Sequence, residues 1–278
     1  MAVVIGNDPA ARPQSGLDLA DVIWEIPAEG FITRYFAIFD SRGSGVIGPV
    51  RSARIYFDQL TKAYGIPMAH AGGNVDALNW IGTWHLLNID AIYGSGGYFW
   101  RWGGRTAPDN LYTSTALLND AARADHFPAA RLILPPSTAQ PQAGSPAATV
   151  TINYMTSPSY TYRAGWRWSG TDWVRLINGV PSVDIAGAAL TAQTVVVLTA
   201  VQVPDPDPYT PGAIKFLWNQ GGTAWVLRNG TSIQGQWHLG PQGLPVVTTA
   251  QGTPIPVGSG LPLWFEVVPA AWQVTITR

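Results

Sequence analysis

The segment GPVRSAR, residues 48–54, carries the clearest candidate chemistry in this sequence. Arg51 and Arg54 lie three residues apart, so a helical first turn would place both guanidinium groups on one face. We expect that helix to begin at Ser52, a residue type that caps helix N-termini well. Free N–H groups, the helix dipole and two planar guanidinium groups together favour a phosphate or carboxylate. A structural role, with both arginines paired to nearby acids, remains open.

A second candidate is the segment EIPAEG, residues 25–30, at the end of an expected strand. Its two carboxylates, Glu25 and Glu29, flank a proline at a strand end, a common position for functional sites. The pair is suited to holding a divalent cation or to general acid and base catalysis. Salt bridges to Arg34 and Arg51 are the structural alternative, because a buried charge needs a partner.

The third candidate is the aromatic, glycine-rich loop at residues 98–112. Arg101 and Arg105 lie within it, and Asn110 and Tyr112 lie near its end. Such a loop can stack on a sugar or ring and bind an anion through its arginines. The alternative is a loop held over the domain by its own aromatic side chains.

One histidine, His70, is a weaker candidate, because it lies at the end of a short apolar stretch before two glycines. A base or ligand is common at such a place, although a lone histidine there is more often structural. The sequence has no His-x-x-x-His pair, phosphate-binding loop, dinucleotide fingerprint or nucleophile elbow. We therefore expect no cofactor and no metal.

The composition limits the kinds of partner. Hydrophobic residues make up 46% of the 278 residues and charged residues only 12%, with a formal net charge of −1. This balance argues against disorder and against binding of nucleic acid. Without cysteine there is no disulfide or thiolate metal site, and no apolar run is long enough for a transmembrane helix. Because no signal peptide is recognisable, we expect a cytoplasmic protein or an exported one that starts after its signal.

The pattern of helices and strands that would position these residues predicts an α+β protein of two domains. In residues 1–140 we expect a mixed α/β sandwich that carries the candidate site. The expected strands are 20–26, 33–40 and 66–71, and the expected helices are 52–64, one capped by Asn74, and one from Ser114 to about Arg123. We expect the stripe of Tyr56, Leu60 and Tyr64, together with Trp80 and Trp84, to lie in the core.

In residues 141–278 we expect only strands and turns, arranged as an antiparallel sandwich or a partly open barrel. The Asn-Gly pairs at 178–179 and 229–230 lie between apolar runs and predict tight hairpins. Residues 135–149, rich in proline and small polar residues, predict a linker between the two domains.

Several of these segments resemble the bacterial YerB-like lipoproteins, a family of unknown function with N- and C-terminal domains. In the first half the resemblance lies in residues 7–41, in GPVRSAR, in AHAGGN (69–74) and in RTAPDNLYTS (105–114). In the second half it lies in YTYRAGWRW (160–168), LINGVPSVD (176–184) and AWVLRNGTSIQGQW (224–237). The family pattern has a histidine where this chain has Asp109. The resemblance implies an extracytoplasmic protein, anchored in its precursor by a lipid on a cysteine that this chain lacks.

Two functions are compatible with these features. The first is a non-catalytic envelope module that binds an anionic ligand, glycan or partner through a cleft of arginines and glutamates. The second is an enzyme that acts on phosphorylated or carboxylated envelope glycans by phosphotransfer or hydrolysis, with or without the help of a metal. The absence of a recognisable nucleophile favours the first, and we expect Glu25, Glu29, Arg51, Arg54, Arg101 and Arg105 to meet in one cleft.

Overall fold

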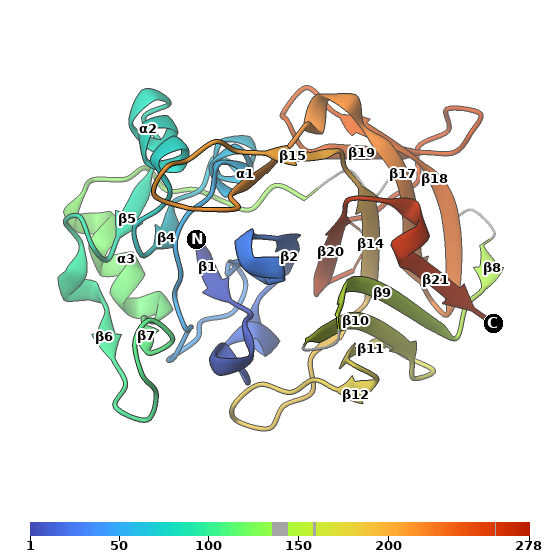
Figure 1. The fold of residues 1–278 in the computed structure, drawn as a ribbon, viewed down its shortest axis with the longest axis horizontal. Helices are drawn as coiled ribbons and strands as arrows, with labels where there is room; N and C mark the ends of the chain where they lie inside the picture. The colour runs from blue at the N-terminus through green and yellow to red at the C-terminus, as the bar shows by residue number, and fades with distance from the viewer. Residues whose placement is uncertain (135–143, 158–159, 259) are drawn as a thin grey trace.

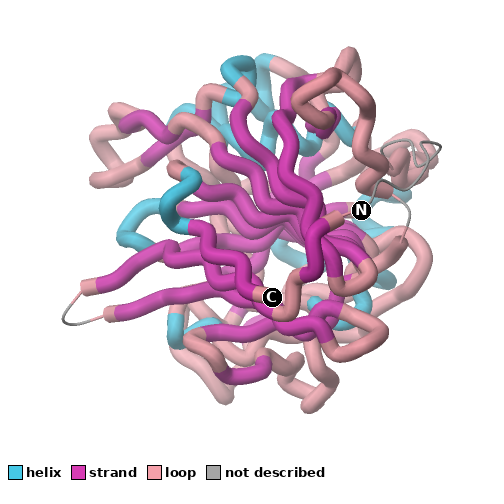
Figure 2. Tube along the Cα trace, turned by 90° about the vertical axis from the view of Figure 1, so that its right-hand side faces the viewer, coloured by secondary structure: helices cyan, strands magenta, loops and turns pink. Residues whose placement is uncertain are grey.

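Both halves of the chain build one large central sheet. A computed structural model of the chain describes residues 1–134, 144–157, 160–258 and 260–278. Figure 2 shows the strands of this sheet crossing the middle of the molecule as a single twisted layer. In order across the sheet they are β19 (Pro245–Thr248), β18 (Thr231–Leu239), β17 (Gly222–Arg228), β14 (Thr194–Thr199), β20 (Leu263–Val268), β2 (Val22–Pro27), β3 (Thr33–Ile38), β1 (Ala2–Gly6), β4 (Met68–His70) and β5 (Asn88–Asp90), and β8 (Ser145–Pro146) pairs with β18.

The two halves meet where β20 lies between β14 and β2 (Figure 1). Strand β20 runs parallel to both neighbours, and Glu25 of β2 is in register with Glu266 of β20. The predicted division at residues 140 and 141 stays a prediction, because residues 135–143 lie outside the described part of the chain. The described remainder of the expected linker includes β8, which is hydrogen-bonded to β18.

Helices and a second sheet cover the two faces of the central sheet. The helices are α1 (Ile55–Tyr64), α2 (Val75–Thr83) and α3 (Thr115–Ala124). The second sheet contains β12 (Val180–Pro181), β11 (Trp173–Ile177), β10 (Thr161–Trp168), β9 (Thr149–Thr156) and β21 (Val274–Thr277), with β13 (Thr191–Ala192) on β11. Two small pairs are β15 (Gln202–Pro204) with β16 (Ile214–Phe216) and β6 (Trp100–Arg101) with β7 (Leu111–Tyr112). The short 3₁₀ helices are η1 (Pro9–Ala11), η2 (Leu17–Leu19), η3 (Glu29–Phe31), η4 (Gly96–Tyr98), η5 (Trp218–Gln220) and η6 (Ala271–Gln273).

Each face of the central sheet has its own apolar core, and each core contains residues of both halves. Helices α1 and α2 cover one face, where Trp24, Phe36 and Phe265 are buried. Helix α3 and the second sheet cover the other, where Ile23 and Trp264 are buried. Strands β2, β3 and β20 are buried along their whole length, as expected for strands that are covered on both faces. The α+β class is confirmed, with all three helices of the described chain in the first half.

Most of the predicted elements are present, with two corrections. Helix α3 is capped as expected, since Ser114 Oγ accepts a hydrogen bond of 3.2 Å from the amide of Leu117. Helix α1 begins at Ile55 rather than Ser52, because the preceding residues are extended and Ala53 forms a bridge with Gly73. The second correction concerns Trp80 and Trp84.

These two tryptophans were expected in the core but are only half-buried. Their rings contact one another, with centroids 4.4 Å apart, and Trp80 packs against the edge of the core as a partly buried side chain. The stripe of Tyr56, Leu60 and Tyr64 is buried as expected.

The two Asn-Gly turns form as predicted. Asn178 and Asn229 have φ values of 51° and 49°, and the glycines that follow them have φ values of 83° and 67°. Two successive residues with positive φ are typical of the type I′ turns that join tight hairpins. Among the described residues, none of the helices has the length and apolar character that spanning a membrane requires.

Candidate functional site

Glu29, just after β2, forms ion pairs with Arg34 and Arg54, and a third arginine, Arg51, is near enough to repel Arg34. We call Glu29, Arg34, Arg51 and Arg54 the arginine cluster. Arg34 Nη2 lies 2.5 Å from Glu29 Oε1, and Arg54 Nε donates to Oε2 at 2.9 Å. The same two guanidinium groups also donate to the carbonyl oxygens of Ser52 and Ala53. The extended GPVRSAR segment thus holds Arg54 against a carboxylate of the neighbouring turn.

The arginine cluster has an excess of positive charge. Burial alone would raise the pKa of Glu29, but Arg34 and Arg54 outweigh it and lower that pKa to about 2. Burial, Arg54 and the more distant Arg51 lower the pKa of Arg34 to about 10, although Glu29 opposes them. At neutral pH the Glu29 carboxylate is therefore paired with two cations, and Arg51 adds a third positive charge nearby. The buried Nε atoms of Arg34 and Arg51 have no hydrogen-bond partner among the described residues.

Of the three arginines of the cluster, Arg51 has the longest ion pair and the most exposed side chain. Its nearest ion pair is with Asp109 Oδ1, at 3.8 Å, and 17% of its side chain is exposed. Burial and the charge of Asp8 raise the pKa of Asp109, while Arg51 lowers it. This contact joins the arginine cluster to loop 98–112. It is a long ion pair, and the raised pKa of Asp109 weakens it further.

The other predicted residues of that loop are held by contacts within the first half. Arg105 donates to the carbonyl oxygens of Ala11 and Pro13, both at 2.7 Å, and to Tyr112 Oη at 3.1 Å. Arg101 is exposed and donates to Asn110 Oδ1 at 2.7 Å. Because its carbonyl contacts fasten the loop to the N-terminal segment, Arg105 has a structural role there.

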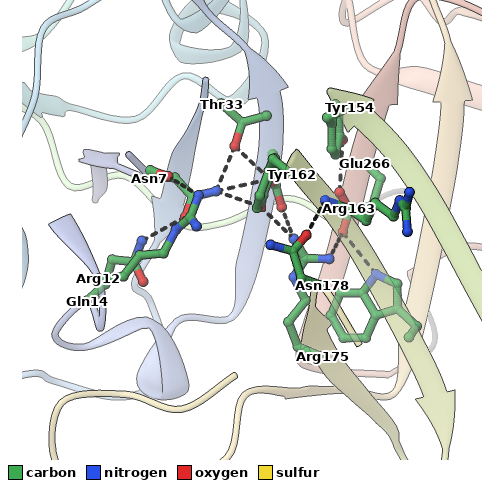
Figure 3. A network of polar contacts seen from close by, with 12 residues as sticks. Asn7, Arg12, Gln14, Thr33, Tyr154, Tyr162, Arg163, Arg175, Asn178 and Glu266 are labelled. Carbon is green, nitrogen blue, oxygen red and sulfur yellow. Dashed lines mark hydrogen bonds and ion pairs between the residues drawn. The ribbon is translucent and has the colours of Figure 1, made fainter. Parts of the chain in front are cut away.

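Glu25 lies in the interior, in a separate ion cluster where the two halves meet. We define this seam network as Asn7, Glu25, Tyr162, Arg175 and Glu266, and Figure 3 labels Asn7, Tyr162, Arg175 and Glu266. The carboxylate of Glu25 accepts hydrogen bonds from Asn7, Tyr162 and Arg175, and from Thr33 Oγ1 at 2.6 Å. Glu25, Arg175 and Glu266 are all fully buried.

Arg175 is the only cation that contacts both glutamates of the seam network, within the described residues. Its Nη1 atom lies 3.0 Å from Glu266 Oε1, which also accepts a hydrogen bond from Trp166. Burial raises the pKa of Glu266 to about 8, with Arg175 opposing and Glu25 adding to the shift. At neutral pH Glu266 is therefore mostly protonated, and the network is close to neutral.

His70 is fully buried at the end of β4. Its Nδ1 lies 2.9 Å from the carbonyl oxygen of Gly72 and 3.8 Å from an oxygen of Asp90. Its Nε2 has no partner among the described residues. The imidazole shapes the turn after β4, and it does not contact any of the other predicted site residues in the described structure.

The structure does not bring the six predicted charges into one cleft. Arg54 and Glu29 form an ion pair, with Arg51 near their partner Arg34, but Glu25 points into the seam network, and Arg101 is exposed on the loop. Glu25 and Glu29 are thus not a metal-binding or acid–base pair, because each is already neutralised by different arginines. A ligand-binding role of the predicted residues stays a prediction.

Sequence reasoning missed Arg175, Glu266 and Tyr162 as partners of Glu25. A signal was present, since WVRLI and LWFEVV each carry a single charge inside an apolar strand. A charge in that position must be paired on burial. The sequence does not reveal which of these strands lie next to one another, and so which charges pair.

Comparison with known proteins identifies the same two parts of the chain. Residues 1–128 match the N-terminal domain of a protein of unknown function (DUF3048), and residues 150–262 match the C-terminal domain of DUF3048. The chain is 28% identical to a Bacillus subtilis (strain 168) protein named "Putative lipoprotein YerB", over 100% of this chain and 83% of the relative. The crystal structure of YerB protein from Bacillus subtilis superimposes with a TM-score of 0.87 at 27% identity, over 100% of this chain and 93% of that chain.

Proposed function

The chain belongs to the DUF3048 family of proteins of unknown function, and from that premise we propose that it is a non-catalytic module of the cell envelope. In this proposal a lipid anchors the precursor outside the cytoplasm, and the arginine cluster binds an anionic ligand or an anionic group of an envelope partner. The lipid anchor is supported by the name of the Bacillus subtilis relative, which aligns along the whole of this chain.

The observation that carries the anion proposal is the charge imbalance of the arginine cluster. Arg34 and Arg54 share the carboxylate of Glu29, and the third and most exposed arginine, Arg51, has only a 3.8 Å contact with Asp109. A planar guanidinium group binds phosphate or carboxylate through paired N–H donors. An anion beside Arg51 would gain those donors and reduce the repulsion among the three cations.

The same geometry gives no support to the enzyme alternative. With a pKa of about 2, Glu29 is too weak a base to take a proton at neutral pH. Glu25 accepts hydrogen bonds from four side chains in the interior and is not exposed to a substrate. The described residues contain no group of three His, Cys, Asp or Glu side chains placed to hold a metal ion.

The test is a binding measurement with inorganic pyrophosphate on the wild type and on Arg51→Ala. We expect the affinity for pyrophosphate to fall about tenfold, because a charge-assisted bidentate contact is lost. Because Arg51 is partly exposed and weakly paired, its removal should change the free energy of unfolding by no more than about 1 kcal/mol. Isothermal titration calorimetry and thermal unfolding report these two quantities separately.

Arg101→Ala is the matched control, because it removes an exposed arginine of the same half that does not contact the arginine cluster. It should leave both the pyrophosphate affinity and the melting temperature unchanged. The proposal fails if the wild type does not bind pyrophosphate, or if the Arg101 and Arg51 variants lose affinity equally.

A further inference from the structure

A pocket of about 550 Å³ lies between α1 and the C-terminal half, and none of the arginine cluster lines it. On one side it is bounded by Gln59, Lys62 and Ala63 of α1. On the other side it is bounded by β16, η5 and the turn between β18 and β19. Gly243 in that turn faces α1 so closely that a Cβ there would lie 3.4 Å from Ala63.

Three aromatic rings form the apolar floor of this pocket. Trp218 packs edge-on against Trp24, with ring centroids 6.4 Å apart, and contacts Phe216 at 5.6 Å. The Trp218 side chain is more than nine-tenths buried, and its indole N–H has no hydrogen-bond partner among the described residues. A buried donor without a partner is costly. Because this N–H is itself covered, a small turn of the ring that brought it to an acceptor atom in the pocket would stabilise it.

The charge of the lining is entirely positive. The pocket contains Lys62 and Lys215, the only two lysines of the whole chain, and no acidic residue lines it. The ammonium group of Lys62 lies 4.4 Å from the ring centre of Trp84, and that of Lys215 lies 3.3 Å from Asp205 Oδ1. These contacts leave each ammonium group further donors for an anion.

The rim of the pocket offers amide groups. The side chains of Gln59, Asn219 and Gln242 line it, and none of them makes a side-chain hydrogen bond within the described structure. An amide supplies both donors and an acceptor, which matches the hydroxyl groups of a sugar. An aromatic acid would leave these amides unpaired, and a simple inorganic anion would leave the apolar floor uncovered.

We infer that this pocket binds a sugar that carries a carboxylate or a phosphate. The ring lies over the aromatic floor, a ring or hydroxyl oxygen accepts from the indole of Trp218, and the anionic group lies between the two lysines. The pocket has the volume of ordinary small-molecule sites and, like many of them, lies where two parts of a chain meet. This site is separate from the arginine cluster and goes beyond the function proposed for it.

The test uses four probes with the full chain: glucuronate, glucose 6-phosphate, glucose and benzoate. Glucuronate and glucose 6-phosphate should both bind and should perturb the NMR signals of the Trp218 indole. Glucose lacks the charge and benzoate lacks the hydroxyl groups, so each should bind about tenfold more weakly or not at all. Failure of both charged sugars to bind, or tighter binding of benzoate or glucose, overturns the inference.

Three variants locate the binding. Lys62→Gln and Lys215→Gln should each reduce the affinity for glucuronate about tenfold. Trp218→Phe keeps the ring and removes the N–H, and should reduce the affinity about fivefold.

The matched controls are Arg167→Gln and Trp272→Phe, exposed residues that do not line the pocket, and both should bind glucuronate like the wild type. Arg51→Ala should also bind it like the wild type, which separates this site from the arginine cluster. Unchanged affinity in the lysine variants, or equal losses in the controls, contradicts the inference.

Discussion

Glu25 and Glu29 are close neighbours in the sequence, yet they belong to two ion clusters of different kinds. Glu25 is fully buried and pairs with Arg175, which comes from the other half of the chain. Glu29 is 19% exposed and pairs with Arg34 and Arg54 of its own half. In the seam network one cation serves two carboxyl groups, whereas in the arginine cluster two cations share one carboxylate and a third lies nearby. The first arrangement joins the halves, and the second leaves charge for a ligand.

The largest expected effect is in the seam network. Arg175→Met replaces the buried cation by an apolar side chain of similar length and leaves Glu25 without its charged partner. Breaking a buried pair on one side costs about 3–5 kcal/mol, so we expect the free energy of unfolding to fall by that amount. Urea denaturation measures it.

Arg163→Gln is the control for Arg175→Met, because Arg163 is exposed on a strand of the same second sheet, β10. It should change stability by less than about 0.5 kcal/mol. A loss below about 1 kcal/mol in the Arg175 variant would show that the seam network does not join the halves, and would remove the contrast with the arginine cluster.

The second effect is an opposite dependence of stability on pH in the two clusters. The pKa of Glu266 is about 8 in the folded chain against an ordinary 4.5, so the folded state keeps a proton that the unfolded state loses. Stability from this group therefore falls as the pH rises between about 4.5 and 8. The pKa of Glu29 is about 2 when folded, so its contribution is present above pH 4.5 and is lost as the pH falls towards 2.

Urea denaturation between pH 3 and 9 tests this contrast. In Glu266→Gln the free energy of unfolding should fall less steeply as the pH rises above 5. In Glu29→Gln it should fall less steeply as the pH drops below 5. Parallel curves for the wild type and Glu266→Gln above pH 5 would show that Glu266 is ionised normally in the folded chain.

The smallest effect concerns ligand affinity in the arginine cluster. In Glu29→Gln the carboxylate that competes with an incoming anion is gone, so pyrophosphate should bind about fivefold more tightly. Asp109→Asn, which removes the ion-pair partner of Arg51, should also raise the affinity for pyrophosphate. Calorimetry gives both values, and a loss of affinity in the two variants would mean that the carboxylates position the arginines rather than compete for them.

The elements that follow from local patterns were predictable from the sequence. The strands β2 and β3, the cap of α3 and the two Asn-Gly turns depend on short runs of residues, and each is present in the structure. Helix α1 starts later than its sequence suggests, since the pairing of Ala53 with Gly73 keeps the preceding segment extended. That pairing joins residues far apart in the chain, and local propensity does not contain it.

The candidate site was predictable only where its residues are close in sequence. The pairing of Glu29 with Arg34, five residues later, follows from a strand end beside a short turn. Glu25 is not in that group because β20 lies next to β2 and places Glu266 beside it, and because β11 of the second sheet brings Arg175 to both glutamates. The position of strands from two halves in one sheet is a property of topology, and a single sequence carries no direct signal for it.

The position of β20 also has a consequence for the order in which the molecule is made. A chain synthesised from its N-terminus completes β2 and β3 long before residues 263–268 exist. During that interval β2, an apolar run with the sequence VIWEIP, has an unpaired edge of the kind that pairs with other chains. The central sheet cannot be completed until nearly the whole chain has been synthesised. The nascent protein must therefore be kept from aggregating until its last strands are made.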